Sequence, residues 1–226
     1  MKLLGIFFLC LCLFSCKNES VTFTETFDYS DGEIPENFWS EGCRASIKNE
    51  QLYVNADTQN PQQSTVWLNK NLSGNISIEF DVHVIASQDT ANNINCFFMY
   101  AHPDENLSLQ STTNKRADAR YGLYHKLNGY IITYLANGNE EKARFRFRKN
   151  PGFNLLKEKF DYECRSGKTY HIKIIKNENN IQYWVDGIQI IDFFEENNHG
   201  LNEGFFAFRT WHTELWWDNL TIKTLN

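Results

Sequence analysis

The chain has 226 residues, of which 22% are charged and 42% are hydrophobic, and its formal net charge at pH 7 is −6. Nucleic-acid phosphates attract basic surfaces, so this acidic balance excludes a nonspecific nucleic-acid binder and we expect no nucleic-acid partner. The length fits one domain of sandwich size.

The N-terminus has the pattern of a secretory signal. Lys2 precedes an apolar run too short to span a bilayer comfortably, and the small Ser15 precedes Cys16. The L-F-S-C ending resembles a bacterial lipobox, which implies that Cys16 is the lipid-modified first residue of the mature protein. We therefore expect a signal peptide over residues 1–15, a lipid-anchored tether over 16–21, and a location in the bacterial cell envelope, either periplasmic or on the outer-membrane surface. A buried apolar helix with an incidental cysteine is the less favoured alternative.

The remaining residues, 22–226, are predicted to form strands and turns in a single domain. In chain order, the expected strands contain TFTETFDY, QLYVNA, TVWLNKNL, NISIEFDVHVIA, INCFFMYA, RYGLYHKL, GYIITYLA, ARFRFRK, TYHIKIIKNE, NIQYWVDGIQIIDF, GFFAFRT and LWWDNLTI. Helix is expected only as short turns, near Asn37 or Leu155, because no window of helix length shows apolar residues at three-to-four spacing. Many short strands without a βαβ rhythm predict an all-β antiparallel sandwich or barrel.

The cleanest alternation is in NISIEFDVHVIA, where Ile76, Ile78, Phe80, Val82 and Val84 fall on one face of the predicted strand. That face is expected to enter the core.

The segment ARFRFRK has the same period but carries arginine on its second face. Arg144, Arg146 and Arg148 alternate with apolar residues, so a strand would present all three on one side. Either these arginines form the solvated face of an antiparallel sheet or they form part of an anion site. The turn pairs Asn128-Gly129 and Asn137-Gly138 separate this strand from its expected neighbours.

Three cysteines, Cys43, Cys96 and Cys164, remain after the N-terminal segment. Their odd number and wide spacing leave two arrangements open, one disulfide with a free thiol or three buried thiols. We favour three buried thiols.

Several motifs resemble the concanavalin A-like lectin/glucanase superfamily. They are FTETFDY near the start, YWVDG in the Asp186-Gly187 hairpin, and FFAFRT and WWDNLTI near the end. The resemblance implies a two-sheet antiparallel jelly-roll sandwich but does not choose a chemistry. By analogy, a structural calcium could lie near Asp28 and Asp218, whereas we expect no other cofactor and no catalytic metal.

A narrower resemblance covers most of the mature chain. The segments VWLNKNLSGNISIEFD, NINCFFMYAHPD, RYGLYH, IQYWVDG and GFFAFRTWHTELWWDNLTI are similar, in order and spacing, to small secreted or lipid-anchored jelly-roll proteins of bacterial polysaccharide-utilisation loci. Some of those relatives belong to systems for uronate-rich polysaccharides, and at least one is an oligosaccharide dehydratase that yields a 4,5-unsaturated uronate. This resemblance implies a sugar ligand more firmly than it implies a reaction.

Elimination at C4 of a uronate needs a group that neutralises the carboxylate, a base for the C5 proton and an acid for the leaving oxygen. Arginine suits the first role because its planar guanidinium binds a carboxylate in two places. We expect His125 to be the base and Tyr124 or Tyr121 the acid. The residues expected to bind substrate are Asn95, Arg120, Tyr134, Arg144, Arg146, Arg209, Trp211 and His212.

A glycoside hydrolase is disfavoured, because hydrolases of this superfamily typically carry an E-x-D-x-x-E strand motif. Glu79 and Asp81 have strand spacing, but no partner glutamate follows.

Two functions therefore stay open. The first, which we favour because acid, base and cation candidates together exceed what binding alone requires, is a carbon–oxygen lyase or dehydratase acting on uronate-containing oligosaccharides. The second is a noncatalytic glycan-binding lipoprotein. In either case the expected partners are an anionic oligosaccharide and, through the lipid anchor, a membrane, and we expect a monomer.

Overall fold

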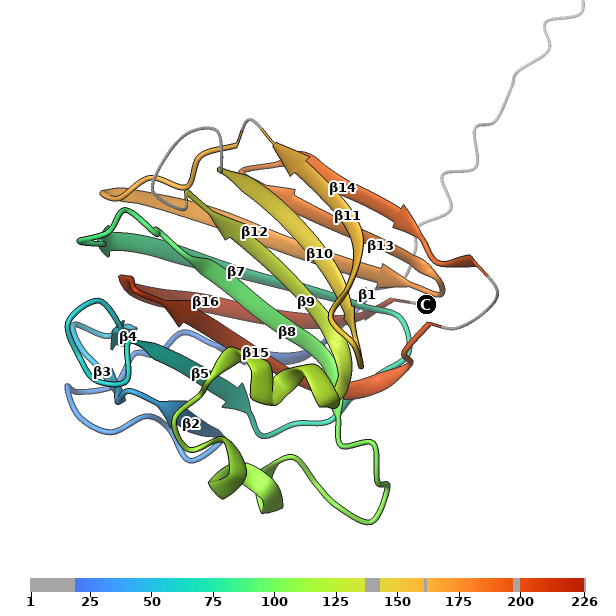
Figure 1. Ribbon diagram of the computed structural model, residues 1–226, viewed down its shortest axis with the longest axis horizontal. Helices are drawn as coiled ribbons and strands as arrows, with labels where there is room; N and C mark the ends of the chain where they lie inside the picture. Colours follow the sequence, from blue (N-terminus) through green and yellow to red (C-terminus); the bar gives the residue numbers. More distant parts are fainter. Residues whose placement is uncertain (1–18, 137–142, 161, 197–199, 226) are drawn as a thin grey trace, which may run out of the picture.

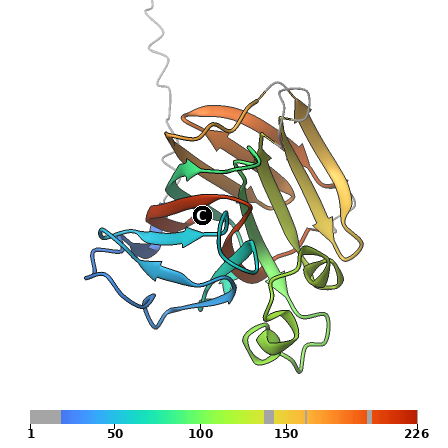
Figure 2. The same cartoon turned by 60° about the vertical axis from the view of Figure 1, so that its left-hand side comes forward.

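The computed structural model describes residues 19–136, 143–160, 162–196 and 200–225. These residues form two packed antiparallel sheets, which confirms the prediction of an all-β jelly-roll sandwich (Figures 1 and 2). The signal peptide, the lipidation at Cys16 and the Asn137-Gly138 turn lie outside the described residues. The first described strand begins at Glu19, inside the segment expected to be a tether.

The first sheet has eight strands. They are β1 (Glu19–Glu25), β3 (Ala45–Ile47), β4 (Leu52–Asn55), β7 (Ile76–Ala86), β12 (Lys168–Asn177), β13 (Asn180–Val185), β14 (Ile188–Phe194) and β16 (Glu214–Leu225). Their spatial order is β14-β13-β12-β7-β16-β4-β3, and β1 pairs with β16. Strands far apart in the sequence therefore lie side by side.

The second sheet also has eight strands. They are β2 (Phe38–Gly42), β5 (Gln63–Leu68), β6 (Leu72–Ser73), β8 (Ile94–Ala101), β9 (Asn128–Leu135), β10 (Arg144–Asn150), β11 (Asn154–Phe160) and β15 (Glu203–Trp211). Their order is β11-β10-β9-β8-β15-β5-β2, and β6 pairs with β15. Asn128 and Gly129, expected to form a turn, instead open β9.

The main core lies between the sheets and follows the predicted alternation. The apolar face of β7, from Ile76 to Val84, is buried, and so are Phe145 and Phe147 of β10. Because side chains alternate along β10, its arginines point to the opposite, outer face of the second sheet. The three cysteines of the described chain are buried free thiols, as favoured from the sequence.

A second apolar cluster covers part of that outer face. The 3₁₀ helix η1 (Gln110–Arg116) lies beside β2, and the residues that flank it, Leu109 and Ala119, join this cluster. The 3₁₀ helix η2 (Tyr121–Lys126) lies near β8 and β15 in Figure 1 and packs through Tyr124 on residues such as Trp67 and Phe97. The strand predicted for RYGLYHKL is therefore wrong. The expected helical turn at Leu155 is also wrong, because Leu155 lies in β11, and Asn37 lies in a turn before β2. In the described part of the chain, no helix is long and apolar enough to cross a membrane.

A buried carboxylate attaches the helical segment to the sheet. Glu41 of β2 is 2% exposed and accepts hydrogen bonds from Arg116 Nη2 at 2.8 Å and from the Tyr124 hydroxyl at 2.6 Å. The Thr113 hydroxyl and the Trp67 indole N–H donate to the same carboxylate at 3.0 and 3.2 Å. Five side chains thus form one buried polar network in which every partner of the carboxylate is a donor.

Replacement of Glu41 by Gln is expected to lower the free energy of unfolding by about 3–5 kcal/mol, because it leaves the Arg116 guanidinium buried without its anion. Urea unfolding followed by tryptophan fluorescence measures this change. The matched control is Glu33→Gln, which removes an exposed carboxylate paired with Arg44 and should change stability little. Equal, small effects of both substitutions would contradict the role given to Glu41.

Candidate functional site

The candidate site is a polar row that crosses five strands on the outer face of the second sheet. Arg209 of β15 is directly opposite Thr65 of β5 and Asn95 of β8, and Asn95 is opposite Thr133 of β9. Thr133 in turn is opposite Arg146 of β10. Neighbouring strands are about 4.8 Å apart, so three strand spacings place the Cα atoms of the two arginines roughly 14 Å apart. Their long side chains can therefore reach a common ligand.

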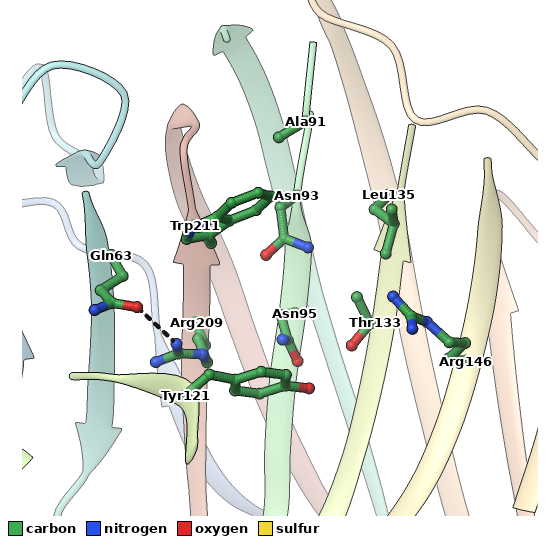
Figure 3. Close-up of a pocket in the computed structure, with 10 residues that line it drawn as sticks. All are labelled: Gln63, Ala91, Asn93, Asn95, Tyr121, Thr133, Leu135, Arg146, Arg209 and Trp211. Carbon is green, nitrogen blue, oxygen red and sulfur yellow. Dashed lines mark hydrogen bonds between the residues drawn. The ribbon is translucent and has the colours of Figure 1, made fainter. Parts of the chain in front are cut away.

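These residues surround a pocket of about 270 Å³, close to the lower end of ligand-pocket volumes of roughly 300–1,000 Å³. We call it the inner pocket. Its lining residues are Gln63, Ala91, Asn93, Asn95, Tyr121, Thr133, Leu135, Arg146, Arg209 and Trp211 (Figure 3).

Arg209 is a buried cation whose contacts are all neutral. It is 1% exposed, and its Nη1 donates to Thr65 Oγ1 at 2.7 Å and to the Ala119 carbonyl at 3.0 Å. Its guanidinium carbon lies 4.9 Å from the centre of the Tyr121 ring and 5.1 Å from that of Tyr124. No carboxylate among the described residues pairs with it. A desolvated guanidinium without an anion favours binding of a negatively charged group.

Arg146 supplies a second positive charge on the opposite side of the pocket. Burial lowers its pKa below the ordinary value, and the nearby charges of Arg144 and Arg148 lower it further. Its nearest carboxylate, on Glu158, is 3.9 Å from Nε, whereas Arg144 lies 3.1 Å from the same carboxylate oxygen. Arg146 Nε has no hydrogen-bond partner among the described residues. Since one carboxylate serves two arginines, the pocket side of this strand has excess positive charge.

Neutral polar groups complete the lining. Asn93 and Asn95 each bury a side-chain oxygen that has no hydrogen-bond partner in the described chain, and both amides are turned toward the pocket (Figure 3). Unpaired buried acceptors are costly, and sugar hydroxyls are donors that would satisfy them. The site therefore combines two cations with acceptors for hydroxyl groups.

Tyr121 is the one predicted acid or base that lines the inner pocket, among the residues the structure describes. It lies in η2, and no other described residue makes a hydrogen bond with its hydroxyl. Its ring meets that of His125 edge-on with centroids 4.8 Å apart, and that of Phe153 at 5.3 Å. The hydroxyl is thus held by aromatic packing and faces a pocket with two arginines (Figure 3).

His125, the expected base, packs against the ring of Tyr121 and is not among the residues that line the inner pocket. Its ring stacks on Phe153 with centroids 3.9 Å apart, and its buried Nε2 has no partner in the described chain. Its pKa is lowered, mainly by burial and also by the positive charges of Arg209 and Arg148. A neutral imidazole that packs against Tyr121 can position that side chain.

Two of the predicted tyrosines are buried and do not line the inner pocket. Tyr124 is fully buried, and its hydroxyl donates to Glu41, so the expectation that it acts as an acid on substrate is corrected. Tyr134 points into the main core, where it stacks on Phe145 at 4.0 Å and donates to the Glu163 carbonyl. Alternation along β9 explains the second error, because Thr133 takes the outer face that had been assigned to its neighbour.

Three other predicted binding residues lie beside the inner pocket and do not line it. Arg120 is exposed and pairs with Asp118 at 2.5 Å. Arg144 pairs with Glu158, and His212 pairs with Asp89. The structure brings four of the predicted binding residues together in the inner pocket: Asn95, Arg146, Arg209 and Trp211.

The sequence analysis missed Gln63, Asn93 and Thr133. A signal existed for Asn93, which is two residues from the predicted Asn95, so alternation places both on one face. No such signal existed for Thr133, because Tyr134 was expected to face the ligand and alternation puts its neighbour on the opposite face. Gln63 is opposite Trp211 in the neighbouring strand, and that pairing of segments 148 residues apart could not be read from spacing.

The chemistry of the lining differs from that of a glycosidase. The described lining includes neither aspartate nor glutamate, whereas glycoside hydrolysis generally uses a carboxylate pair across the bond. Among the described residues, no group of three or more His, Cys, Asp or Glu side chains is arranged to hold a metal ion.

The geometry predicts that His125 titrates below the ordinary histidine value of about 6.5 and that its pKa rises in Arg148→Gln, where one nearby positive charge is gone. Because the folded pKa is below the unfolded one, this histidine reduces stability as the pH falls below about 6.5 and on through the folded pKa. NMR titration of the imidazole protons measures the shift. His83, whose pKa is lowered by burial, serves as the control and should not move. An unchanged His125 titration would contradict the proposed charge coupling.

Solved structures with similar folds share little sequence with this chain. A protein of unknown function with a galectin-like fold from Bacillus subtilis is 17% identical, with a TM-score of 0.74 over 92% of this chain and 98% of that chain. The carbohydrate-binding module CBM66 from the same species is 15% identical, with a TM-score of 0.51 over 90% and 97%. An endo-β-1,3-glucanase from Pyrococcus furiosus is 10% identical, with a TM-score of 0.58 over 93% and 96%. At these identities the likeness shows the fold alone, and this fold agrees with the superfamily resemblance of the sequence motifs.

No curated protein sequence matches the chain. A family model does match, over residues 58–220, and its description is a domain of unknown function, DUF6250. The match covers well over half of the sequence and includes every residue of the inner pocket. The chain therefore belongs to the DUF6250 family.

Proposed function

We propose that this protein binds the uronate residue of an oligosaccharide in the inner pocket and catalyses β-elimination there. The observation that carries the proposal is the lining itself, in which Arg209 and Arg146 flank the hydroxyl of Tyr121 and no described carboxylate intervenes. The surrounding amides match the hydroxyl groups of a sugar. Membership of the jelly-roll class adds support, since CBM66 is named as a carbohydrate-binding module and another similar structure as a glucanase.

Binding depends on the arginines. Arg146 lines the pocket and has the positive charges of Arg144 and Arg148 beside it. We therefore assign Arg146 to binding of the substrate carboxylate. Neutralising that carboxylate favours removal of the C5 proton, because negative charge develops on the carboxylate as the proton leaves. The buried Arg209 is fixed by Thr65 and Ala119 and contributes a permanent positive potential beneath Tyr121.

The proton transfers are assigned to Tyr121. Its oxygen receives the C5 proton while its own proton passes to the leaving oxygen on C4, and the C5–H electron pair becomes the C4=C5 double bond. The C4–O bond breaks with its electron pair on the leaving oxygen. The products are a 4,5-unsaturated uronate and either water, in a dehydratase, or the shortened alcohol, in a lyase. A single tyrosine serves both transfers when the proton and the leaving group lie on the same side of the ring.

Tyr121→Phe tests this reaction. With a panel of uronate-ended oligosaccharides, the wild-type protein should produce an ultraviolet absorbance rise from the conjugated double bond, and the variant should lose turnover by at least about 100-fold, since one group carries both proton transfers. Mass spectrometry of the products separates loss of water from chain cleavage. Ligand-dependent thermal stabilisation should persist in the variant. Full activity of Tyr121→Phe would remove Tyr121 from its catalytic role.

Arg146→Gln tests the carboxylate contact. Loss of a charge-assisted hydrogen bond should weaken binding of a uronate ligand about 10- to 100-fold, as measured by calorimetry. The analogue whose carboxylate is reduced to a hydroxymethyl group should bind both proteins alike. Arg44→Gln is the control, because Arg44 is exposed and pairs with Glu33 away from the pocket. An equal loss for the charged and the reduced ligand would speak against a specific carboxylate contact.

A noncatalytic glycan-binding role is the second candidate. One observation favours it: Tyr121 is the single proton-transfer side chain in the described lining. Elimination can instead use two such groups, a base and a separate acid. Under this function Arg146→Gln weakens binding, but no panel member yields an unsaturated product.

A further inference from the structure

A second pocket opens beside the inner pocket, and the two share a wall. This outer pocket has a volume of about 460 Å³ and is lined by residues 60–63 together with Asp118, Arg120, Trp211 and His212. Gln63 and Trp211 also line the inner pocket. The Gln63 side chain links the two sides, because its Nε2 donates to the Asp118 carbonyl at 3.1 Å and its Oε1 lies 3.5 Å from Arg209 Nη2.

Trp211 forms a fixed apolar plate between the pockets. One face of its indole stacks on the His212 imidazole with centroids 4.1 Å apart, and the residue is 39% exposed. His212 is itself held by a hydrogen bond between its ring and Asp89, by its backbone N–H donating to the Gln62 carbonyl at 3.0 Å, and by its carbonyl accepting from the Ser87 hydroxyl at 2.6 Å. An immobilised, exposed indole offers the flat apolar surface that matches the C–H face of a pyranose.

The two pockets differ in charge. In the outer pocket the Arg120 guanidinium is paired with Asp118 at 2.5 Å, and the His212 ring shares a hydrogen bond with Asp89. The charge of Arg120, the one lysine or arginine in the described lining, is therefore balanced there by a carboxylate. In the inner pocket Arg209 has no carboxylate partner among the described residues, and Arg146 shares the carboxylate of Glu158, 3.9 Å away, with Arg144. The inner pocket suits an acidic sugar, and the outer pocket suits an uncharged one with hydroxyl groups for the paired side chains and glutamines.

We infer that the outer pocket is a second sugar subsite, which binds the neutral residue linked to the uronate. This inference rests on the proposed function of the inner pocket. The ligand chain would lie with its uronate between the two arginines, pass Trp211 and place the adjoining neutral sugar against Arg120. The minimal well-bound ligand is then a disaccharide with one acidic and one neutral residue.

The test compares binding of matched ligands by calorimetry. The probes are glucuronate and galacturonate alone, and disaccharides in which either one is linked to a neutral hexose or deoxyhexose. Where turnover is detected, Tyr121→Phe protein replaces the wild type. The best disaccharide should bind at least about tenfold more tightly than its uronate alone. Trp211→Ala should reduce that ratio to less than about threefold, and Trp211→Phe should retain most of it.

Arg120→Ala tests the outer pocket without changing the inner one, because Arg120 is exposed and lines only the outer pocket. It should lower the ratio of disaccharide to monosaccharide affinity several-fold, whereas the control Arg44→Ala should leave the ratio unchanged. Two results would overturn the subsite while leaving the uronate pocket in place. The first is that the monosaccharide binds and the second sugar adds no affinity. The second is that the disaccharide binds more tightly but both Trp211→Ala and Arg120→Ala retain that increase in affinity. Tighter binding of a disaccharide with two acidic residues would overturn the neutral assignment. No binding of either ligand class would overturn the proposed function and the subsite together.

Discussion

The rest of the site depends on the hydrogen bonds that the buried carboxylate of Glu41 accepts. It accepts hydrogen bonds from the guanidinium of Arg116, the hydroxyl of Tyr124 and the indole of Trp67, and so ties the segment with both 3₁₀ helices to the second sheet. Tyr121 belongs to the same segment and has no comparable attachment of its own. Its place at the pocket therefore follows from a network centred on a residue 80 positions earlier in the chain.

A second constraint is the charge on Arg209. Burial of a guanidinium is unfavourable, and this protein offsets the cost with a hydroxyl, a carbonyl and aromatic faces rather than with a carboxylate. The arrangement keeps the cation available to an incoming anion. Arg146 contributes in the same direction, because it shares the single carboxylate of Glu158 with Arg144. The positive potential of the pocket is thus built into the scaffold before any ligand arrives.

The scaffold itself does not choose this chemistry. Galectin-like, binding-module and glucanase structures share the two-sheet arrangement at 10–17% identity, so the fold supports many uses. The polar groups of the candidate site lie on the outer face of the second sheet, where the helical segment, the polar row and the stacked pair of Trp211 and His212 meet. The two pockets on that face differ in charge although they share a wall.

The sequence by itself determined most of the long strands and the core, because the period of two in β7 and β10 depends on neighbouring residues and fixes which side chains are buried. It also placed Arg146 on an outer face. Only the tertiary structure decided which strands are adjacent, and hence that Arg209, Asn95 and Arg146 share one row, since strand order and register arise from packing between distant segments. The same reason explains the error at RYGLYHKL. Its local pattern fits a strand, but contacts with distant residues such as Glu41 and Phe153 stabilise a 3₁₀ helix, which buries Tyr124 and leaves Tyr121 at the pocket.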